Sequence, residues 1–579
     1  MADDVVDGRT ANRTPVCPLH DTLAAMSAGI ATGQSALSTE LQDLVGSLAR
    51  DDEPGFAAGV YSEGELVTAA AAGCAVSEHQ VRITEHTAFE IASVSKHITS
   101  TCLLLLVSDG LINLDDDIRT RLPELALRQP VTLRQCLTHT AGLRDYFSLC
   151  EAIGVPVPGL SEGRSMDVIT GQRDTDFPPG SAFSYSNTGY VLAAALVRRL
   201  TGASLAQFAA ERVFGPLGMT ATRFRDDVGV QMPRLANGYV AASGKDGQTT
   251  FRREDVTETV VGDGGCVTSL TDLAAWHGFM ASGAVLGTKI RDGLFAGQVL
   301  SDGTPAGYGL GLASIDIAGE PAWWHSGSWA GYRTAVIYLP ARRAGISVLA
   351  NRNDKYASHI AAAAATALVT GTDVRACYTS AAGIPVPPGD AGSAGAEVAG
   401  LWHAPALDLY LDFRARDGEI IIPDEGGEQA FRLGTDGRWH GIGTASGATF
   451  TRRGDALAAG WGLSAGLEDS YVRADSQPAV APSPSLPSGL FLNEELTAYA
   501  RTKGNGAPAE ITSGLAPPRQ LEPAGDGGWR AETGNPLTVR VADAGARLLI
   551  SVPGAHHLVF DRVADDGEVA LPRGLRVAR

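Results

Sequence analysis

The sequence predicts an α+β domain, an antiparallel sheet packed with a helical region as an α/β sandwich, followed by two small antiparallel β-barrels. Strand-like segments lie near both ends of residues 36–380, and helical periodicity fills the middle. Stretches rich in Pro, Gly, Ala and Ser at 381–397 and 477–488 predict linkers. The segments 398–476 and 489–579 alternate apolar and polar residues in short pieces, as barrel strands do.

The order of elements in the first domain supports this prediction. Residues 1–35 are polar and are interpreted as an N-terminal extension. A helix is expected from residue 39, and the segments 56–61 and 66–72 predict a β-hairpin around a Ser-Glu-Gly-Glu turn. A helix over 93–108 follows. Further helices are predicted at 131–138, 188–201, 204–213, 270–281 and 356–370, and strands at 322–325, 333–339 and 345–350.

The two C-terminal segments resemble each other in their first residues. Residues 399–402 read Ala-Gly-Leu-Trp, and residues 488–491 read Ser-Gly-Leu-Phe. Alternating pieces recur in both segments, at 407–413, 419–422, 448–452, 537–541 and 547–552. Two related barrels are the expected result.

Composition excludes several classes of function. The chain has 579 residues, too many for a single ordinary core, and 44% of them are hydrophobic, which excludes general disorder. A formal charge of −19 disfavours nucleic acid and anionic membrane surfaces as partners. The seven cysteines lack metal-ligand spacing, so neither a metal nor a cofactor is expected. The acidic N-terminus shows no signal-peptide pattern, and we expect a cytoplasmic protein.

The first candidate motif is Ser93-Val94-Ser95-Lys96, at the start of a predicted helix. A spacing of three places Ser93 and Lys96 on one helical face, where the amine can take the proton of the hydroxyl. Alone the motif is weak, and by itself it favours Ser93 as a helix cap and Lys96 as a solvated first-turn residue.

Two further motifs lie downstream. Tyr185 and Asn187 are two apart in an extended piece, which points a phenol and an amide in one direction, although an ordinary turn before a helix explains them equally well. His325-Ser326-Gly327-Ser328 forms a strand in which glycine permits close approach of a ligand. A satisfied histidine beside tryptophans is the alternative there.

Taken in order, these motifs resemble those of the serine β-lactamase/penicillin-binding-protein superfamily. Segments at 137–143, 214–219 and 264–269 also resemble family segments, with Ala141 in place of a usual serine. The resemblance covers roughly residues 36–375. The third-motif histidine and the two trailing barrels are most similar to the three-domain D-aminopeptidases.

The resemblance implies catalytic roles for named residues. Ser93 is expected to attack the carbonyl, with Lys96 and Tyr185 moving its proton. Because a phenol titrates near 10, Tyr185 would need a strong downward pKa shift, for which Lys96 is the evident cation. The backbone N–H groups of Ser93 and Ser328 are expected to form the oxyanion hole.

The remaining motif residues are expected to bind substrate. The resemblance implies that Asn187 and His325 line the cleft, with His325 counted among the catalytic residues, and that Ser326 and Gly327 contact the substrate edge. His139 is expected to hold a loop rather than to transfer protons. Whether the second barrel reaches into the cleft is left open.

The function expected from this resemblance is a serine hydrolase that works through an acyl-enzyme. The first choice is an aminopeptidase or amidase that releases N-terminal D-amino acids from short peptides or amides. An esterase or acyltransferase is the alternative, and a D,D-carboxypeptidase, a β-lactamase or a non-catalytic binding protein is disfavoured. The expected partner is a small peptide, amide or ester, with no nucleic acid and no membrane. The sequence does not decide between a monomer and a homodimer.

Overall fold

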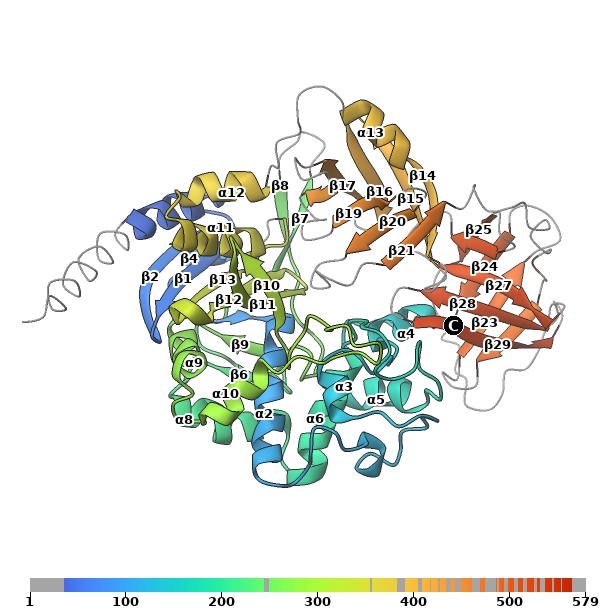
Figure 1. Cartoon of the computed structure of the whole chain (residues 1–579), viewed down its shortest axis with the longest axis horizontal. Coiled ribbons are helices and arrows are strands. Elements are labelled where there is room, and N and C mark those ends of the chain that lie inside the picture. The colour runs from blue at the N-terminus through green and yellow to red at the C-terminus, as the bar shows by residue number, and fades with distance from the viewer. Residues whose placement is uncertain are drawn as a thin grey trace, which may run out of the picture.

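The computed structural model describes residues 36–382, apart from 244–248 and 355–356, and residues 391–564, apart from short connections between barrel strands (Figure 1). The extension predicted at 1–35 lies outside the described residues, as does nearly all of the linker predicted at 477–488. The first domain and two barrels follow one another along the chain, as the composition predicts.

A six-stranded antiparallel sheet forms the centre of the first domain. Its strand order is β10-β11-β12-β13-β1-β2, so that strands from both ends of the domain pair with each other. The predicted hairpin and the three later strands are confirmed, and β10 is an additional edge strand. The bounds are β1 (Phe56–Ser62), β2 (Glu65–Ala72), β10 (Ala313–Ile317), β11 (Glu320–Trp329), β12 (Tyr332–Leu339) and β13 (Ala344–Ala350).

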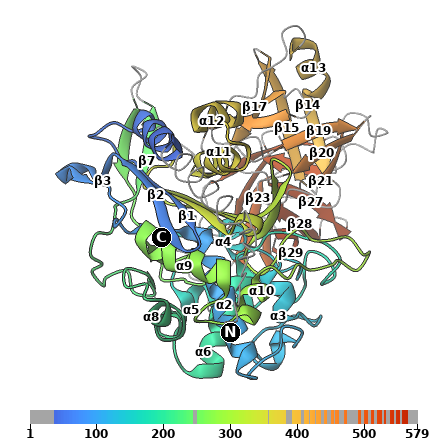
Figure 2. The same ribbon diagram turned by 60° about the vertical axis from the view of Figure 1, so that its left-hand side comes forward.

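The two faces of this sheet are covered by different helices. Alternate residues of a strand point to opposite faces, so Phe56 packs with α11 (Ala357–Thr370) and the helix that covers residues 36–48. Ala57 instead belongs to the larger apolar cluster under α9 (Leu270–Ser282), on the face that carries the helical region (Figure 2). The predicted sandwich is therefore confirmed.

The helical region surrounds α2 (Lys96–Ser108), whose residues from Lys96 to Leu106 are all buried. The predicted helices are confirmed, except that the one expected at 204–213 continues from α7 as a π-helical turn over Ala210–Phe214. The helices α4, α5, α8 and α10 were not predicted. The bounds are α3 (Leu133–Leu137), α4 (Tyr146–Ala152), α5 (Glu162–Thr170), α6 (Thr188–Thr201), α7 (Leu205–Ala209), α8 (Gly215–Leu217) and α10 (Thr288–Leu294).

Short strands join the helical region to the sheet. The three-stranded sheet β5-β9-β6 contains β5, from which the chain enters the turn that carries Ser93. The bounds are β3 (Cys74–Val76), β4 (Val81–Arg82), β5 (Phe89–Glu90), β6 (Arg223–Phe224), β7 (Tyr239–Ser243), β8 (Thr249–Arg253) and β9 (Cys266–Thr268).

The segment predicted as a linker at 381–397 differs from the expectation. Helix α12 (Val374–Ala382) reaches into it, and α13 (Ala391–Val398) covers most of its second half. The end of α13 is held by the first barrel, because Val398 is buried in the barrel core and its carbonyl accepts a hydrogen bond from the Trp402 indole at 2.7 Å. Tertiary packing thus stabilises a helix where the composition indicated a structureless connection.

Both C-terminal segments form closed eight-stranded antiparallel barrels, as predicted. In each barrel every strand pairs with the next, and the last strand closes on the first. The first barrel contains β14 (Gly400–Ala404), β15 (Leu409–Arg416), β16 (Glu419–Asp424), β17 (Gly427–Leu433), β18 (Trp439–Ile442), β19 (Thr449–Arg453), β20 (Ala456–Gly460) and β21 (Asp469–Arg473). The second contains β22 (Gly489–Asn493), β23 (Ala498–Lys503), β24 (Ala509–Ser513), β25 (Arg519–Pro523), β26 (Gly528–Ala531), β27 (Thr538–Ala542), β28 (Arg547–Val552) and β29 (Ala555–Ala564).

The second barrel docks on the first domain beside α4. Arg144 and Asp176 form an ion pair at 3.1 Å whose side chains are less than a tenth exposed. Both residues also bond the backbone of His556, whose N–H donates to Asp176 at 3.0 Å and whose carbonyl accepts from Arg144 at 3.3 Å. Within the part of the chain that the structure describes, no helix is long and apolar enough to cross a membrane.

Candidate active site

Ser93 lies on a tight turn between β5 and α2. The turn is a 3-10 helix over Ala92–Ser95, and Ala92 adopts a φ of 47°, which an alanine rarely does. The Ile91 N–H donates to the carbonyl of Cys266 in β9 at 2.9 Å, and this bond fixes the chain just before the turn. A strained backbone held by its neighbours is common at catalytic sites, and here it presents the Ser93 hydroxyl.

Lys96 is fully buried, and its ammonium has three hydrogen-bond acceptors. Nζ lies 2.9 Å from the Ser93 Oγ, 2.8 Å from the Asn187 Oδ1 and 2.7 Å from the carbonyl oxygen of Asp263. These bonds aim the amine at the hydroxyl. The predicted Ser93–Lys96 contact is therefore present, and the reading of Lys96 as a solvated first-turn residue is wrong.

Burial also sets the protonation of Lys96. Loss of water around the amine lowers the pKa of Lys96 to about 8, although the nearby carboxylates of Asp263 and Asp145 act in the opposite direction. A neutral amine carries a lone pair that can accept the serine proton. Near neutral pH a useful fraction of Lys96 is thus in the form that a general base requires.

Tyr185 lies against Lys96, as predicted, but its pKa does not shift in the expected direction. The lysine Nζ is 4.9 Å from the phenol ring centroid. Burial raises the pKa of Tyr185 well above 10, although its hydrogen bond with Ser93 acts to lower it. The sequence indicated the nearby Lys96 cation but not the loss of water around the phenol. The expected downward shift of the Tyr185 pKa is therefore wrong. The phenol stays protonated.

His139 holds the loop that carries Tyr185, as the sequence indicated. Its Nδ1 accepts the Ser186 N–H at 3.1 Å, and its ring lies 4.2 Å from the Tyr185 ring. Burial, with Lys96 nearby, keeps the pKa of His139 well below its usual value. Asn187 ends the same loop, and its own N–H donates to the carboxylate of Asp145 at 2.5 Å.

His325 lies behind the catalytic residues rather than on the cavity wall. Its side chain is fully buried, with Nε2 2.8 Å from the Tyr308 hydroxyl and Nδ1 2.6 Å from the carbonyl oxygen of Ser326. Its ring is 6.2 Å from that of Tyr185. The histidine thus belongs to a buried aromatic cluster that supports Tyr185, and this differs from the expected position in the cleft.

Gly327 is required by packing and not by a ligand. A Cβ at this position would lie 2.1 Å from the carbonyl oxygen of Ile91 and 2.3 Å from the Thr334 Oγ1. Strand β11 therefore runs against the turn that carries Ser93, and the next residue, Ser328, reaches the cavity.

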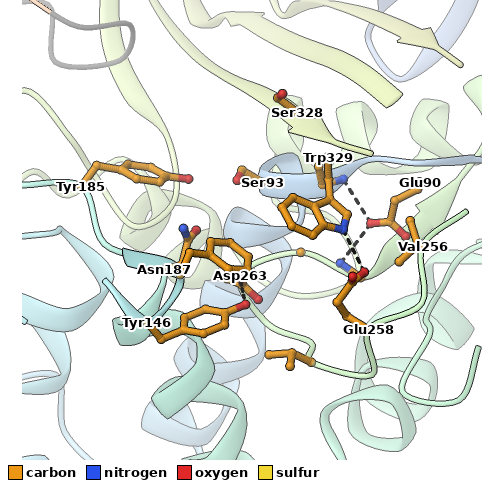
Figure 3. Close-up of a pocket in the computed structure, with 15 residues that line it drawn as sticks. Glu90, Ser93, Tyr146, Tyr185, Asn187, Val256, Glu258, Asp263, Ser328 and Trp329 are labelled. Carbon is orange, nitrogen blue, oxygen red and sulfur yellow. Dashed lines mark hydrogen bonds between the residues drawn. The ribbon is translucent and has the colours of Figure 1, made fainter. Parts of the chain in front are cut away.

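A cavity of about 280 Å³ opens beside the Ser93 hydroxyl (Figure 3). Among the described residues, fifteen line it, and His325, Ser326 and Gly327 are not among them. All fifteen belong to the first domain, including Ser93, Tyr185, Asn187 and Ser328 from the predicted set. The other lining residues were not predicted from the sequence; they are chiefly Glu90, Tyr146, Phe147, Glu258, Asp263 and Trp329.

Little in the sequence could have identified these lining residues. Trp329 directly follows the third motif, and Asp263 directly precedes the family-like segment 264–269. The backbone of Asp263 holds Lys96, and its carboxylate accepts a hydrogen bond from Tyr146 at 3.0 Å. Glu258 lies in an extended segment with no motif.

Comparison with known proteins places this site in a family. The family model described as Beta-lactamase matches residues 41–371, more than half of the chain. The chain belongs to the beta-lactamase family. The match includes Ser93, Lys96, Tyr185 and the third motif, so the resemblance found in the sequence is confirmed.

Curated relatives of this beta-lactamase-family chain include proteins named D-aminopeptidase. The one from Gluconobacter oxydans is 30% identical over 58% of this chain and 63% of its own length, just under two thirds. The one from Cereibacter sphaeroides strain ATCC 17029 is 27% identical over 83% of this chain and 88% of its own length.

Solved structures share the fold at lower identity. The octameric penicillin-binding protein homologue from Pyrococcus abyssi aligns with a TM-score of 0.51 at 19% identity, covering 78% of this chain and 99% of that chain. The crystal structure of SurE aligns with a TM-score of 0.52 at 22% identity, covering 76% of this chain and 99% of that chain.

Proposed function

We propose that this protein is a serine aminopeptidase or amidase that releases N-terminal D-amino acids from short peptides and amides through an acyl-enzyme. The observation that carries the proposal is the 2.9 Å contact between the Lys96 amine and the Ser93 hydroxyl at the wall of the cavity. The curated relatives named D-aminopeptidase support the substrate class.

In the acylation step, neutral Lys96 takes the proton of Ser93 while the serine oxygen bonds to the substrate carbonyl carbon. The carbonyl oxygen becomes an oxyanion, for which we propose the backbone N–H groups of Ser93 and Ser328 as donors. When the C–N bond breaks, Lys96 returns its proton to the leaving amine, with the protonated phenol of Tyr185 beside both groups. Water then hydrolyses the ester.

The other motif residues act by positioning. Asn187 holds the Lys96 amine through its side-chain oxygen, at 2.8 Å, and its amide also borders the substrate cavity. His325 supports Tyr185 through the Tyr308 hydroxyl and the aromatic cluster. Gly327 and Ser326 shape strand β11, which carries Ser328 to the cavity.

A substrate panel tests this function. We expect the wild type to cleave the p-nitroanilide of D-alanine in preference to that of L-alanine, and Ser93→Ala to lose both amide and p-nitrophenyl acetate turnover. Mass spectrometry of the stalled enzyme should show the acyl group on Ser93. Turnover of the ester without any D-selective amide cleavage would favour an esterase or acyltransferase instead.

A further inference from the structure

One wall of the cavity joins a carboxylate to two aromatic rings. The Trp329 indole donates a hydrogen bond to the Glu258 Oε2 at 3.0 Å (Figure 3). The Trp329 ring also stacks on that of Phe147, with centroids 5.0 Å apart. Glu258 comes from the extended segment before Asp263, and Phe147 from α4. Three distant segments therefore meet at this wall beside the nucleophile.

Glu258 is nearly buried and has only neutral partners. The residue is 9% exposed, and besides Trp329 its carboxylate accepts bonds from the backbone N–H and the hydroxyl of Thr257, at 3.2 and 3.3 Å. Among the described residues, none brings a Lys or Arg nitrogen within 4.0 Å of it. A buried carboxylate without a counter-charge is costly, and a cationic ligand would reduce that cost.

A second carboxyl group at the same cavity has an oxygen without a partner among the described residues. Glu90 is 1% exposed, and its Oε1 accepts the N–H groups of Ala92 and Gly265 at 3.2 and 3.0 Å. Its Oε2 has no hydrogen-bond partner among the described residues, although Glu90 lines the same cavity. Buried polar atoms are almost always paired, so an unpaired one at a cavity wall indicates a polar partner supplied by a ligand.

The described lining of the cavity is acidic in composition. Its described lining includes the carboxyl groups of Glu90, Glu258 and Asp263 and no Lys, Arg or His. Such a lining attracts an ammonium group and repels a carboxylate, which distinguishes a substrate with a free amine from one with a free acid.

We infer that Glu258, held by Trp329, is the subsite that binds an ammonium group of the substrate's acyl part. The faces of Trp329 and Phe147 add cation–π attraction to the carboxylate. The ammonium comes from one of two sources, the α-amine or a basic side chain of the N-terminal residue. The inference rests on the proposed function, because it assigns the substrate of the same serine site.

The test compares esters that differ only in one charge. Methyl esters of D-alanine and D-lactate report on the α-ammonium, and those of N-acetyl-D-lysine and N-acetyl-D-norleucine report on a side-chain ammonium. We expect Glu258→Gln, which keeps an acceptor for Trp329, to lower kcat/KM for one cationic ester relative to its neutral counterpart by about 10- to 100-fold. The pair affected identifies the source of the ammonium.

Glu254→Gln is the matched control, since Glu254 is exposed four residues earlier and does not line the cavity. In both ester pairs, Glu254→Gln should keep the wild-type ratio of kcat/KM for the cationic ester to that for the neutral ester. If Glu258→Gln also keeps both ratios, Glu258 only supports Trp329 and the inference is overturned. If Glu258→Gln lowers the ratio of kcat/KM for a cationic ester to that for its neutral counterpart, but the wild type cleaves no D-aminoacyl amide, the subsite is supported and the proposed aminopeptidase function fails.

Inhibition of the wild type provides a measurement that does not depend on a folded variant. Butylammonium and butanol should compete with the D-lactate ester, and we expect butylammonium to bind at least 10-fold more tightly. Equal inhibition by the two compounds would mean that the acidic lining does not bind cations, which would also overturn the inference.

Discussion

Adding one methyl group at Gly327 should damage catalysis far more than it damages the fold. The Cβ of Gly327→Ala would begin 2.1 Å from the Ile91 carbonyl oxygen, where ordinary contact needs at least 3.4 Å. Strand β11 and the turn before Ser93 must therefore separate by about 1.3 Å. The same methyl group would crowd Thr334, whose hydroxyl donates to Ile91 at 2.8 Å.

This displacement would move apart the two segments that carry the proposed oxyanion donors, the backbone N–H groups of Ser93 and Ser328. Ile91 lies two residues before Ser93, and Gly327 lies directly before Ser328. A misplacement of about 1 Å costs about 100-fold in rate, and loss of one oxyanion donor costs about 100- to 1,000-fold. Overpacking itself costs only about 1–3 kcal/mol of stability. We therefore expect kcat to fall at least 100-fold in a protein that still folds.

The assay is single-turnover acylation by p-nitrophenyl acetate, with circular dichroism and the unfolding midpoint measured on the same samples. Gly163→Ala is the control, because a Cβ at this exposed position in α5 has no neighbour within 4 Å. It should keep the wild-type rate. An acylation rate for Gly327→Ala within about threefold of wild type would refute the proposed contribution of this strand to catalysis.

Two further predictions concern pH. For p-nitrophenyl acetate, which has no amine of its own to titrate, kcat/KM should rise with pH through about 8 as Lys96 loses its proton. Burial also raises the pKa of Glu90 to about 8, so the same profile could come from Glu90. The rise of kcat/KM with pH must therefore persist in Glu90→Gln. If the rise disappears in that variant, the role of Lys96 as base is contradicted. Burial lowers the pKa of His277 to about 3, so below the unfolded value near 6.5 the unfolded chain binds the proton more readily. Stability should therefore fall from pH 6.5 towards pH 3 by up to about 1.4 kcal/mol per pH unit for this group, and urea midpoints of His277→Gln should show a shallower fall.

The sequence predicted the residues that a short motif fixes, and it missed those that only tertiary packing brings in. Ser93 and Lys96 are one helical turn apart, so their contact follows from local geometry. Glu258 and Trp329 are 71 positions apart, and the extended segment around Glu258 has no periodicity that indicates what it faces. The helix α4 was missed for a similar reason: it is seven residues long and is fixed by a cap at Asp145 and by packing.

The fold class followed from alternation and linker composition, but the environment of each side chain did not. His325 illustrates this limit, because a histidine in a strand can face a cleft or a core with the same sequence around it. Here the strand places His325 on the buried side, against Tyr308, while Ser328, three residues later, reaches the cavity. The glycine between them is explained by the approach of Ile91, which lies more than 200 positions away.

Burial assigns different roles to the two groups that flank Ser93. Removing water disfavours the charged form of any side chain, so the same environment lowers the pKa of the Lys96 amine and raises that of the Tyr185 phenol. Near neutral pH the Lys96 amine can accept a proton, and the Tyr185 phenol can only share the one it holds. This difference supports the proposed role of Lys96 as the base that activates Ser93. The carboxylates of Asp263 and Asp145 keep the pKa of Lys96 from falling further, as protonation of a leaving amine requires.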